Sequence, residues 1–357
     1  KFNVTEQPSG IAGITDDQEA ERTVVVKVTD KKNGNAFTNN PLVRAIGVQK
    51  IVVVIVLIAL IAFFSAVSPS FRQYSTLLSI MDYTYYLAFL GIGVTFCLIT
   101  GGVDLSIGTG MFCYALIGGY LITRQGMPVI VGILATLICG LVMGIINGLI
   151  VSKGGHAPFL ATLCTMMIAR GLGAIATGGA SVTWPGATAP NGWTRSLFKL
   201  TIGETKLPLG FLWVMILAVV MSIVLNKTRT GRYIIAIGSN KEATRLSGIN
   251  VAKYQTMAYI FSGIFTGLAA LAYSSAFQSM APGGGGGVEL NAIGGAIIGG
   301  TSMSGGAGSI SGTILGVFIM SVLQTGLPLI GLQANYQQII IGLVLIVAVY
   351  IDVLKNK

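Results

Sequence analysis

The chain has 357 residues, of which 53% are hydrophobic and only 10% are charged, and its formal net charge is +10. Soluble domains average about 25% charged residues, so this composition excludes an ordinary soluble domain and indicates a membrane protein. The four cysteines lie in apolar runs without paired spacing, which predicts neither a disulfide framework nor a metal site.

The first 44 residues differ from the rest, because they are polar, carry charges of both signs and contain almost no aromatic residue. Such a segment buries too little apolar surface to fold, so we predict a mobile, polar cytoplasmic tail at 1–44. The transmembrane domain is then expected at 45–357, with an outer loop at 179–207 and a cytoplasmic loop at 226–253.

The remaining chain is expected to be an all-α polytopic membrane protein of about ten transmembrane helices. A spanning helix needs about 20 mostly apolar residues. Suitable stretches lie at 51–67, 77–100, 104–123, 128–152, 157–178, 208–226, 254–275, 288–301, 308–330 and 335–353. The eighth stretch is too short to span alone, which predicts a half helix or a broken one.

The positions of Lys and Arg predict the orientation, since basic residues gather in cytoplasmic loops. With the N-terminus inside, sixteen basic residues fall on the cytoplasmic side and five on the outer side. The outer five are Arg72, Arg124, Arg195, Lys199 and Lys206. Both termini are therefore predicted to be cytoplasmic, and the net charge reflects topology and not nucleic-acid binding.

One phrase occurs twice in apolar surroundings: Gly-Gly-Val-Asp-Leu-Ser at 101–106 and Gly-Gly-Val-Glu-Leu-Asn at 286–291. In the predicted topology the first lies in the cytoplasmic half of the membrane and the second in the outer half. This predicts an inverted repeat, helices two to five against seven to ten, with broken or half helices near 101–108 and 286–300. Such repeats place a substrate path at their interface.

The doubled phrase brings two carboxylates, Asp104 and Glu289, to membrane depth. One interpretation is that each holds the free N–H groups at a helix start. The other is that one or both face a wet cavity and contact polar substrate. Arg170 is a third intramembrane charge, which could contact a partner at the outer mouth, form an ion pair or reach the headgroups.

Glycines recur at every fourth residue in three helices, a spacing that lets helix backbones approach closely. They are Gly140, Gly144 and Gly148, then Gly263 and Gly267, then Gly308, Gly312 and Gly316. We expect these glycines to pack helices together.

The cytoplasmic loop contains signals for a short helix outside the membrane. Ser239 or Asn240 can cap a helix that begins near Lys241, and Gly248 can end it. Such a helix could contact a cytoplasmic partner, whereas the alternative is a basic loop held against anionic headgroups.

Four motifs, in this order, carry a family resemblance. They are the phrase at 101–108, Pro-Phe-Leu-Ala-Thr-Leu at 158–163, the loop at 238–250, and Gly-Gly-Thr-Ser-Met-Ser-Gly-Gly at 299–306. Together they resemble the permease subunit of ribose, xylose and galactose type ABC sugar importers, over residues 45–355.

The resemblance implies a protein of the bacterial cytoplasmic (inner) membrane with several partners. These are a second permease copy or a close relative, two cytoplasmic ATPase subunits, an extracytoplasmic sugar-binding protein and membrane lipid. It also implies that the loop between helices six and seven couples the chain to the ATPase. The residues so assigned are Gly238, Ser239, Asn240, Glu242, Ala243 and Gly248.

The implied function is import of a monosaccharide, a pentose or a hexose, by alternating access. The sequence has no phosphate-binding Gly-x-x-x-x-Gly-Lys-Ser/Thr loop, so we expect neither an enzyme nor a cofactor in this chain, with ATP bound by the partner subunit. The candidates for the translocation path are Asp104, Glu289, Asn291, Gln278 and Arg170. The alternatives are a related ABC permease for nucleosides or branched-chain amino acids, or an ion-coupled secondary transporter that uses Asp104 or Glu289.

Overall fold

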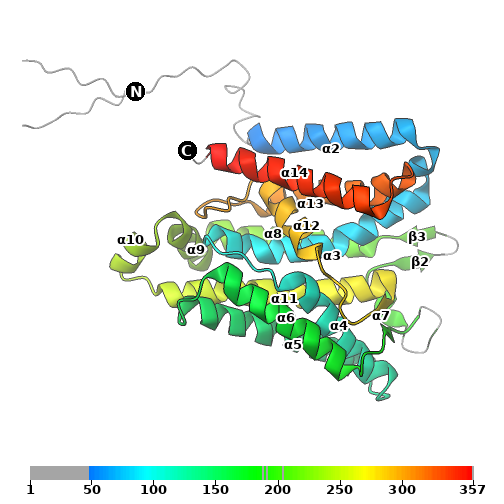
Figure 1. Cartoon of the computed structure of the whole chain (residues 1–357), viewed down its shortest axis with the longest axis horizontal. Helices are drawn as coiled ribbons and strands as arrows, with labels where there is room; N and C mark the ends of the chain where they lie inside the picture. Colours follow the sequence, from blue (N-terminus) through cyan, green and yellow to red (C-terminus); the bar gives the residue numbers. More distant parts are fainter. Residues whose placement is uncertain (1–47, 187–188, 190–191, 203–204, 356–357) are drawn as a thin grey trace, which may run out of the picture.

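The computed structural model describes residues 48–186, 189, 192–202 and 205–355, and the predicted tail at 1–44 lies outside them. Within these residues, ten apolar helices form one bundle, which confirms the all-α membrane fold (Figure 1). Eight are long and apolar enough to cross a membrane. They are α2 (Val48–Val67), α3 (Tyr74–Ile99), α5 (Val129–Ser152), α6 (Pro158–Ala176), α8 (Leu209–Lys227), α11 (Val251–Phe277), α13 (Ile310–Leu329) and α14 (Ala334–Lys355).

The other two apolar helices are shorter: α4 (Ile107–Thr123) and α12 (Val288–Ile298). Each begins just after, or inside, one copy of the doubled phrase, so the predicted broken helices are confirmed. The start of α4 lies three residues later than the predicted start at residue 104, because the chain from 102 to 105 is irregular.

The short elements gather at the two ends of the bundle (Figure 1). At one end lie α9 (Arg229–Ser239) and α10 (Lys241–Leu246); α7 (Trp193–Ser196) and a hairpin of β2 (Leu200–Ile202) and β3 (Thr205–Leu207) lie at the other. The strand β1 (Val182–Thr183) pairs antiparallel with β4 (Ser279–Met280), which connects the loop after α6 to the segment before α12. A 3-10 turn, Pro69–Arg72, joins α2 to α3.

The helices α3 and α11 form the centre of the bundle and run antiparallel. The Tyr83 and Phe277 rings are 5.3 Å apart near the start of α3, whereas Cys97 Sγ lies 3.5 Å from the Ala258 carbonyl oxygen near its end. Every residue at 84–99 of α3 is buried. A helix that is apolar on all sides, as this one is, belongs inside the protein.

The packing of the helices confirms the inverted repeat. One repeat comprises α3 to α6 and the other α11 to α14, with the long helices α3 and α11 in equivalent places. Each long helix packs against the third helix of the other repeat, α3 on α13 and α11 on α5. Each short helix packs against the helix that follows it, α4 on α5 and α12 on α13. The two repeats are therefore interlocked.

Two of the predicted glycine stripes pack against each other. Gly140 and Gly144 of α5 face Gly263 of α11, and a Cβ on Gly263 would overlap the carbonyl oxygen of Gly140. A Cβ on Gly144 would lie 2.6 Å from the Tyr259 carbonyl oxygen. The α5 and α11 backbones are thus in direct contact, at a separation that excludes larger residues.

The third stripe packs within the second repeat. A Cβ on Gly312 would overlap the backbone of Gly299, and one on Gly316 would overlap the carbonyl oxygen of Gly295. The short helix α12 is held against α13 in this way, which explains how eleven residues can keep a fixed place in the bundle.

The predicted cytoplasmic loop at 226–253 is mostly helical. The short helix was predicted correctly, since Asn240 Oδ1 accepts a hydrogen bond from Ala243 N at 2.9 Å and Gly248 follows the helix at φ +78°. No element was predicted at 229–239, where the structure has α9. Ile234 and Ile237 of α9 are buried while its arginines are exposed, so tertiary packing stabilises this amphipathic helix.

We expect Gly263→Ala to lower the free energy of unfolding by about 1–3 kcal/mol, because the new methyl group overpacks the α5 and α11 contact. Thermal unfolding of the purified full chain measures this. The matched control is Gly171→Ala on α6, where no atom lies within 4 Å of the new Cβ. Equal midpoints for the two variants would contradict the proposed packing role.

Candidate translocation path and coupling helix

Asp104 is buried in a polar cluster at the start of α4, with 1% of its surface exposed. Its Oδ1 accepts hydrogen bonds from Ser106 N at 3.0 Å and Ser106 Oγ at 2.6 Å, and its Oδ2 accepts one from Ser262 Oγ at 2.7 Å. Ser106 Oγ in turn accepts from Asn147 Nδ2 at 2.8 Å. The carboxylate therefore ties the broken segment to both α5 and α11.

This geometry favours the helix-start interpretation for Asp104, since it holds a free backbone N–H just before α4. Hydrogen bonds to a charged acceptor are the stronger ones, and three of them offset part of the cost of burial. A contact between Asp104 and substrate stays a prediction. Asn147 could have been noticed in the sequence as the one amide inside the fourth predicted membrane helix at 128–152, whereas Ser262 gave no signal.

Glu289, the second residue of α12, lies against the first turn of α4. Its Oε1 accepts a hydrogen bond from Gly287 N at 3.0 Å. Its Oε2 contacts the position that a Cβ on Gly108 would take and has no hydrogen-bond partner among the described residues, although only 8% of Glu289 is exposed. A buried oxygen without a partner is costly, so Glu289 has unused acceptor capacity.

Arg170 of α6 lies in the same region. A Cβ on Gly286 would lie 3.2 Å from Arg170 Nη2, so the guanidinium group lies beside the glycine segment at 283–287 that precedes Glu289. Among the described residues, the ion pairs are Lys199 with Asp82 and Arg245 with Glu242. An ion pair for Arg170, one of the predicted alternatives, is thus not found in this part of the chain.

Two other predicted path residues lie in different surroundings. Asn291 is half-buried on α12, two residues after Glu289. Gln278 follows α11 with a positive φ of +61°, and its carbonyl oxygen accepts a hydrogen bond from Trp184 N at 2.9 Å. The structure therefore places Arg170 and Asn291 near Glu289, but it places Gln278 beside the paired strands β1 and β4.

Three motifs that are far apart in the sequence meet at the end of the bundle where α9 and α10 lie. A Cβ on Gly238 would overlap the carbonyl oxygen of Ile99, which accepts a hydrogen bond from Gly306 N at 2.9 Å. A Cβ on Gly305 would lie 2.9 Å from both Gly101 N and the Gly238 carbonyl oxygen. We call Ile99, Gly101, Gly238, Gly305 and Gly306 the glycine junction.

The glycine junction joins the end of α9 to the first helix break, at the end of α3, and to the loop that follows α12. It touches the turn between α3 and α4 and the loop between α12 and α13, so α9 contacts one segment from each repeat. Asp352 of α14 holds the second loop, because its Oδ2 accepts from Met303 N at 3.0 Å and Ser302 Oγ at 3.3 Å. Asp352 gives no local signal in the sequence, because its partners are about fifty residues away.

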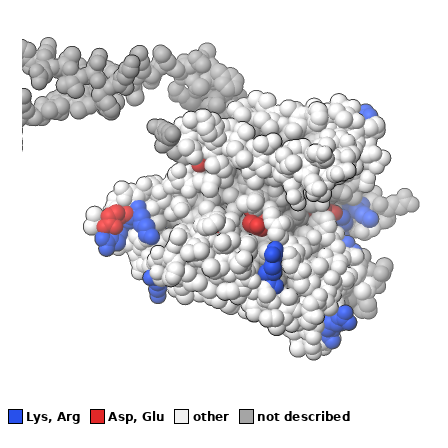
Figure 2. All heavy atoms as spheres, viewed as in Figure 1, with Lys and Arg blue, Asp and Glu red and all other residues white. Residues whose placement is uncertain are grey.

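The helix α10 projects from this end of the bundle, where charged side chains gather (Figures 1 and 2). Glu242 and Arg245 form an exposed ion pair at 2.5 Å, and hydrogen bonding from Arg245 lowers the pKa of Glu242. Leu246 beside them is 78% exposed. A cleft of about 480 Å³ lies between α10, the end of α5 and the start of α11. This end can therefore offer another protein both charged and apolar contacts.

Comparison with known proteins places the chain in a family. The family described as branched-chain amino acid transport system / permease component matches residues 76–349. The ribose import permease protein RbsC of Escherichia coli (strain K12) is 36% identical over 304 residues, which cover 84% of this chain and 92% of RbsC. No solved structure gave a significant match.

Two further relatives have similar coverage. RbsC of Bacillus subtilis (strain 168) is 35% identical over 301 residues, covering 84% of this chain and 91% of the relative. The galactose/methyl galactoside import permease protein MglC of Haemophilus influenzae is 32% identical over 314 residues, covering 84% and 93%. With its bundle of apolar helices, the chain is a multi-pass membrane protein that belongs to the family of ABC transporter permeases containing RbsC and MglC.

Proposed function

We propose that this chain is the membrane-spanning permease subunit of an ATP-driven importer that moves a monosaccharide into the cytoplasm by alternating access. The observation that carries the proposal is the similarity to sugar import permeases over 84% of the chain. The matched region of the chain, residues 76–349 in the family comparison, includes the cytoplasmic loop at 226–253 and both copies of the doubled phrase. The helix breaks, the interlocked repeats and the projecting α10 are the parts that such a mechanism uses.

A sugar is the preferred substrate class. The family description names branched-chain amino acid transport, but the relatives at 32–36% identity are named for ribose and for galactose or methyl galactoside. A pentose and a hexose therefore both fall within the proposal. Selectivity can be assigned to an extracytoplasmic binding protein, so the permease needs only a small, polar path.

The proposal requires partners for ATP hydrolysis and for substrate delivery. The sequence has no P-loop, so ATP would be bound by two cytoplasmic ATPase subunits and no cofactor is assigned to this chain. A binding protein would deliver the sugar from outside, and a second permease copy or a close relative would complete the path. The end with α9 and α10 is proposed as cytoplasmic, because six basic residues lie between 227 and 253.

The glycine junction is the proposed link between the ATPase and the path. Movement of an ATPase subunit would displace α10, and α10 is joined to α9 through the cap at Asn240. Through Gly238, the end of α9 contacts the first helix break at Ile99 and the loop between α12 and α13 at Gly306, with no side chain between the backbones to absorb motion. A displacement of α9 would therefore reach both repeats together, as a switch between two access states requires.

Glu289 and Arg170 are the proposed polar contacts for the sugar. Glu289 Oε2 has unused acceptor capacity for a sugar hydroxyl, and the Arg170 guanidinium group supplies donors beside Gly286. Asn291 adds an amide on the same helix. Gln278 stands as a weaker candidate at the outer end, and Asp104 holds the start of α4 in place.

The first test is reconstitution of the chain in liposomes, with and without the ATPase subunits and the binding protein. We expect uptake of radiolabelled ribose, xylose or galactose only when ATP and both partners are present. Uptake by the chain alone, driven by a Na⁺ or H⁺ gradient, would replace the importer by a secondary transporter. Uptake of leucine in place of all three sugars would change the substrate class.

The second test is Gly238→Ala, which places a methyl group at the Ile99 carbonyl oxygen and separates the glycine junction. We expect sugar uptake to fall about tenfold or more, which corresponds to roughly 1.4 kcal/mol, while basal ATP hydrolysis by the complex continues. Gly171→Ala is the matched control. Uptake at the parent rate by a Gly238→Ala complex would remove the junction from the coupling route.

The third test separates the two buried carboxylates. Asp104→Asn turns an amide N–H₂ toward hydrogen-bond donors, so we expect the free energy of unfolding to fall by about 1.5–3 kcal/mol. Glu289→Gln keeps the shape and removes the charge, so we expect slower sugar uptake with an unchanged midpoint of thermal unfolding. Full uptake by Glu289→Gln would remove Glu289 from the path, and a stable Asp104→Asn protein would contradict the role of Asp104 at α4.

A further inference from the structure

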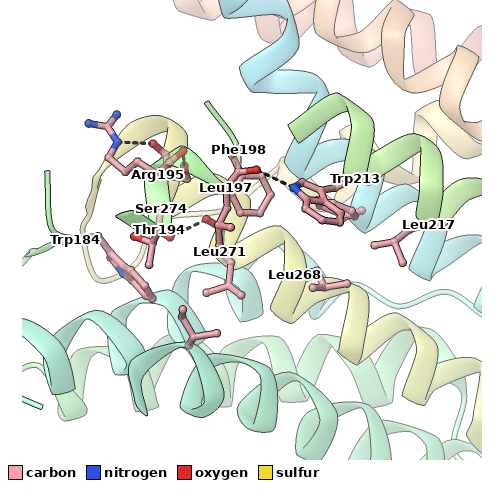
Figure 3. A pocket seen from close by; sticks show the side chains of 13 residues that line it. Trp184, Thr194, Arg195, Leu197, Phe198, Trp213, Leu217, Leu268, Leu271 and Ser274 are labelled. Atoms are coloured by element: carbon pink, nitrogen blue, oxygen red, sulfur yellow. Dashed lines mark hydrogen bonds between the residues drawn. The ribbon is translucent and has the colours of Figure 1, made fainter. Parts of the chain in front are cut away.

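A cavity of about 340 Å³ lies at the end of the bundle opposite α10, apart from Asp104 and Glu289. It is enclosed by the starts of α5 and α8, the last turns of α11, the middle of α3 and the segment around α7 (Figure 3). The residues that line it are Phe89, Ile133, Trp184, Thr194, Arg195, Leu197, Phe198, Trp213, Leu217, Leu268, Leu271, Ser274 and Ser275. Its volume lies in the range of about 300–1,000 Å³ that is typical of small-molecule sites.

The cavity has an apolar floor and opens toward the surface that lipid covers. Phe89 and Trp184 are buried at 1% and 3% exposure, whereas Trp213 and Leu197 are 43% and 40% exposed. Trp213 belongs to α8, and apolar residues dominate the outer surface of this helix. The exposed side of α8 therefore lies where acyl chains surround the protein.

The polar groups of the lining are largely used within the protein. The indole N–H groups of Trp213 and Trp184 donate to backbone carbonyls at 2.8 and 2.9 Å. The hydroxyls of Ser274 and Ser275 also donate to backbone carbonyls, at 2.9 and 3.4 Å. A sugar would find few partners on these walls, whereas a hydrocarbon chain needs none.

One charged residue, Arg195, lines the cavity, and two further cations lie near it along the chain. Arg195 Nε donates to the Ser275 carbonyl oxygen at 2.9 Å, and Figure 3 shows the two terminal nitrogens turned outward. Lys199 pairs with Asp82 at 2.6 Å, and Arg195 and Lys206 also lie within electrostatic range of this one carboxylate. The positive charges of Lys199, Arg195 and Lys206 are thus balanced by one nearby carboxylate, that of Asp82. Burial lowers the pKa of Arg195, yet a guanidinium group remains charged in proteins.

We propose that this cavity binds one acyl chain of an anionic phospholipid, with the lipid phosphate held by Arg195. Hydrocarbon burial favours the apolar part. A guanidinium group matches the planar geometry of phosphate oxygens, and Trp213 at the mouth suits the interface between hydrocarbon and headgroups. The lipid would fill the space between α8 and the pair of α5 and α11.

Photo-crosslinking of the purified full chain in nanodiscs tests the proposal. The probe is phosphatidylglycerol with a diazirine in its acyl chain, and the modified peptides are mapped by mass spectrometry. We expect adducts on the cavity-facing residues of α8 and α11, and competition by excess unlabelled phosphatidylglycerol. Adducts spread evenly over all lipid-facing helices, without competition, would overturn the proposal.

Two variants with matched controls separate the acyl chain from the headgroup. Leu271→Trp fills the cavity and should reduce cavity adducts about tenfold, which corresponds to a loss of roughly 1.4 kcal/mol in lipid binding free energy. Its control, Leu343→Trp on the exposed side of α14, should leave the cavity adducts unchanged. Arg195→Gln should reduce labelling by phosphatidylglycerol but not by a phosphatidylcholine probe, and Arg124→Gln at the same end should change neither.

The outcomes are distinguishable even if a variant folds poorly, because competition on the parent protein needs no substitution. Equal labelling of the parent by the two lipid probes would overturn recognition of the phosphate by Arg195. Unchanged adducts in a folded Leu271→Trp protein would overturn the acyl site. The test measures no transport, so it is independent of the proposed function.

Discussion

Direct contact between helix backbones at glycine is the constraint on which this structure depends. Lipid is as apolar as a leucine side chain, so helices in a membrane associate through close packing and hydrogen bonds more than through the hydrophobic effect. Here such contacts join α5 to α11, α12 to α13, and α9 to the segments that follow α3 and α12. The first two hold the bundle together, and the third joins its end to α9. The same short distance leaves no room for a side chain at any of these places.

The helix breaks need this packing. An interrupted helix exposes backbone groups and, in this chain, brings a carboxylate with each break, which would be costly in lipid. Asp104 is satisfied by Ser106 and by Ser262 of the other repeat, so interlocking of the repeats stabilises the first break. Glu289 keeps an oxygen without a partner among the described residues. The two copies of one phrase have therefore become different sites, one satisfied within the protein and one with acceptor capacity left.

The two ends of the molecule differ in how closely the helix backbones approach each other. At the end with α10, glycine contacts bring backbones together without intervening side chains, and charged groups project beyond them. At the opposite end, a cavity lined by large aromatic residues and Arg195 lies between α8 and the pair of α5 and α11. A motion at the first end would pass directly into the bundle. The second end has space that a flexible molecule such as an acyl chain can fill.

The sequence by itself determined the elements whose signals are local. Apolar length predicted all ten membrane helices, the spacing of glycines predicted the close contacts, and Asn240 with Gly248 predicted the bounds of α10. The doubled phrase predicted both breaks and the repeat. The helix α9 escaped prediction, because its stability comes from burying Ile234 and Ile237 and not from its own composition.

Only the tertiary structure decided which of these elements meet. Three arrangements depend on contacts between residues that are distant in the chain. Gly238 touches Ile99, and Ser262 and Asn147 lie around Asp104. Asp352 holds the loop at Met303. The cavity beside Arg195 depends on six separate segments at once. Composition and spacing describe which face each helix can bury. Which helix packs against that face depends on how all the helices pack together in one bundle.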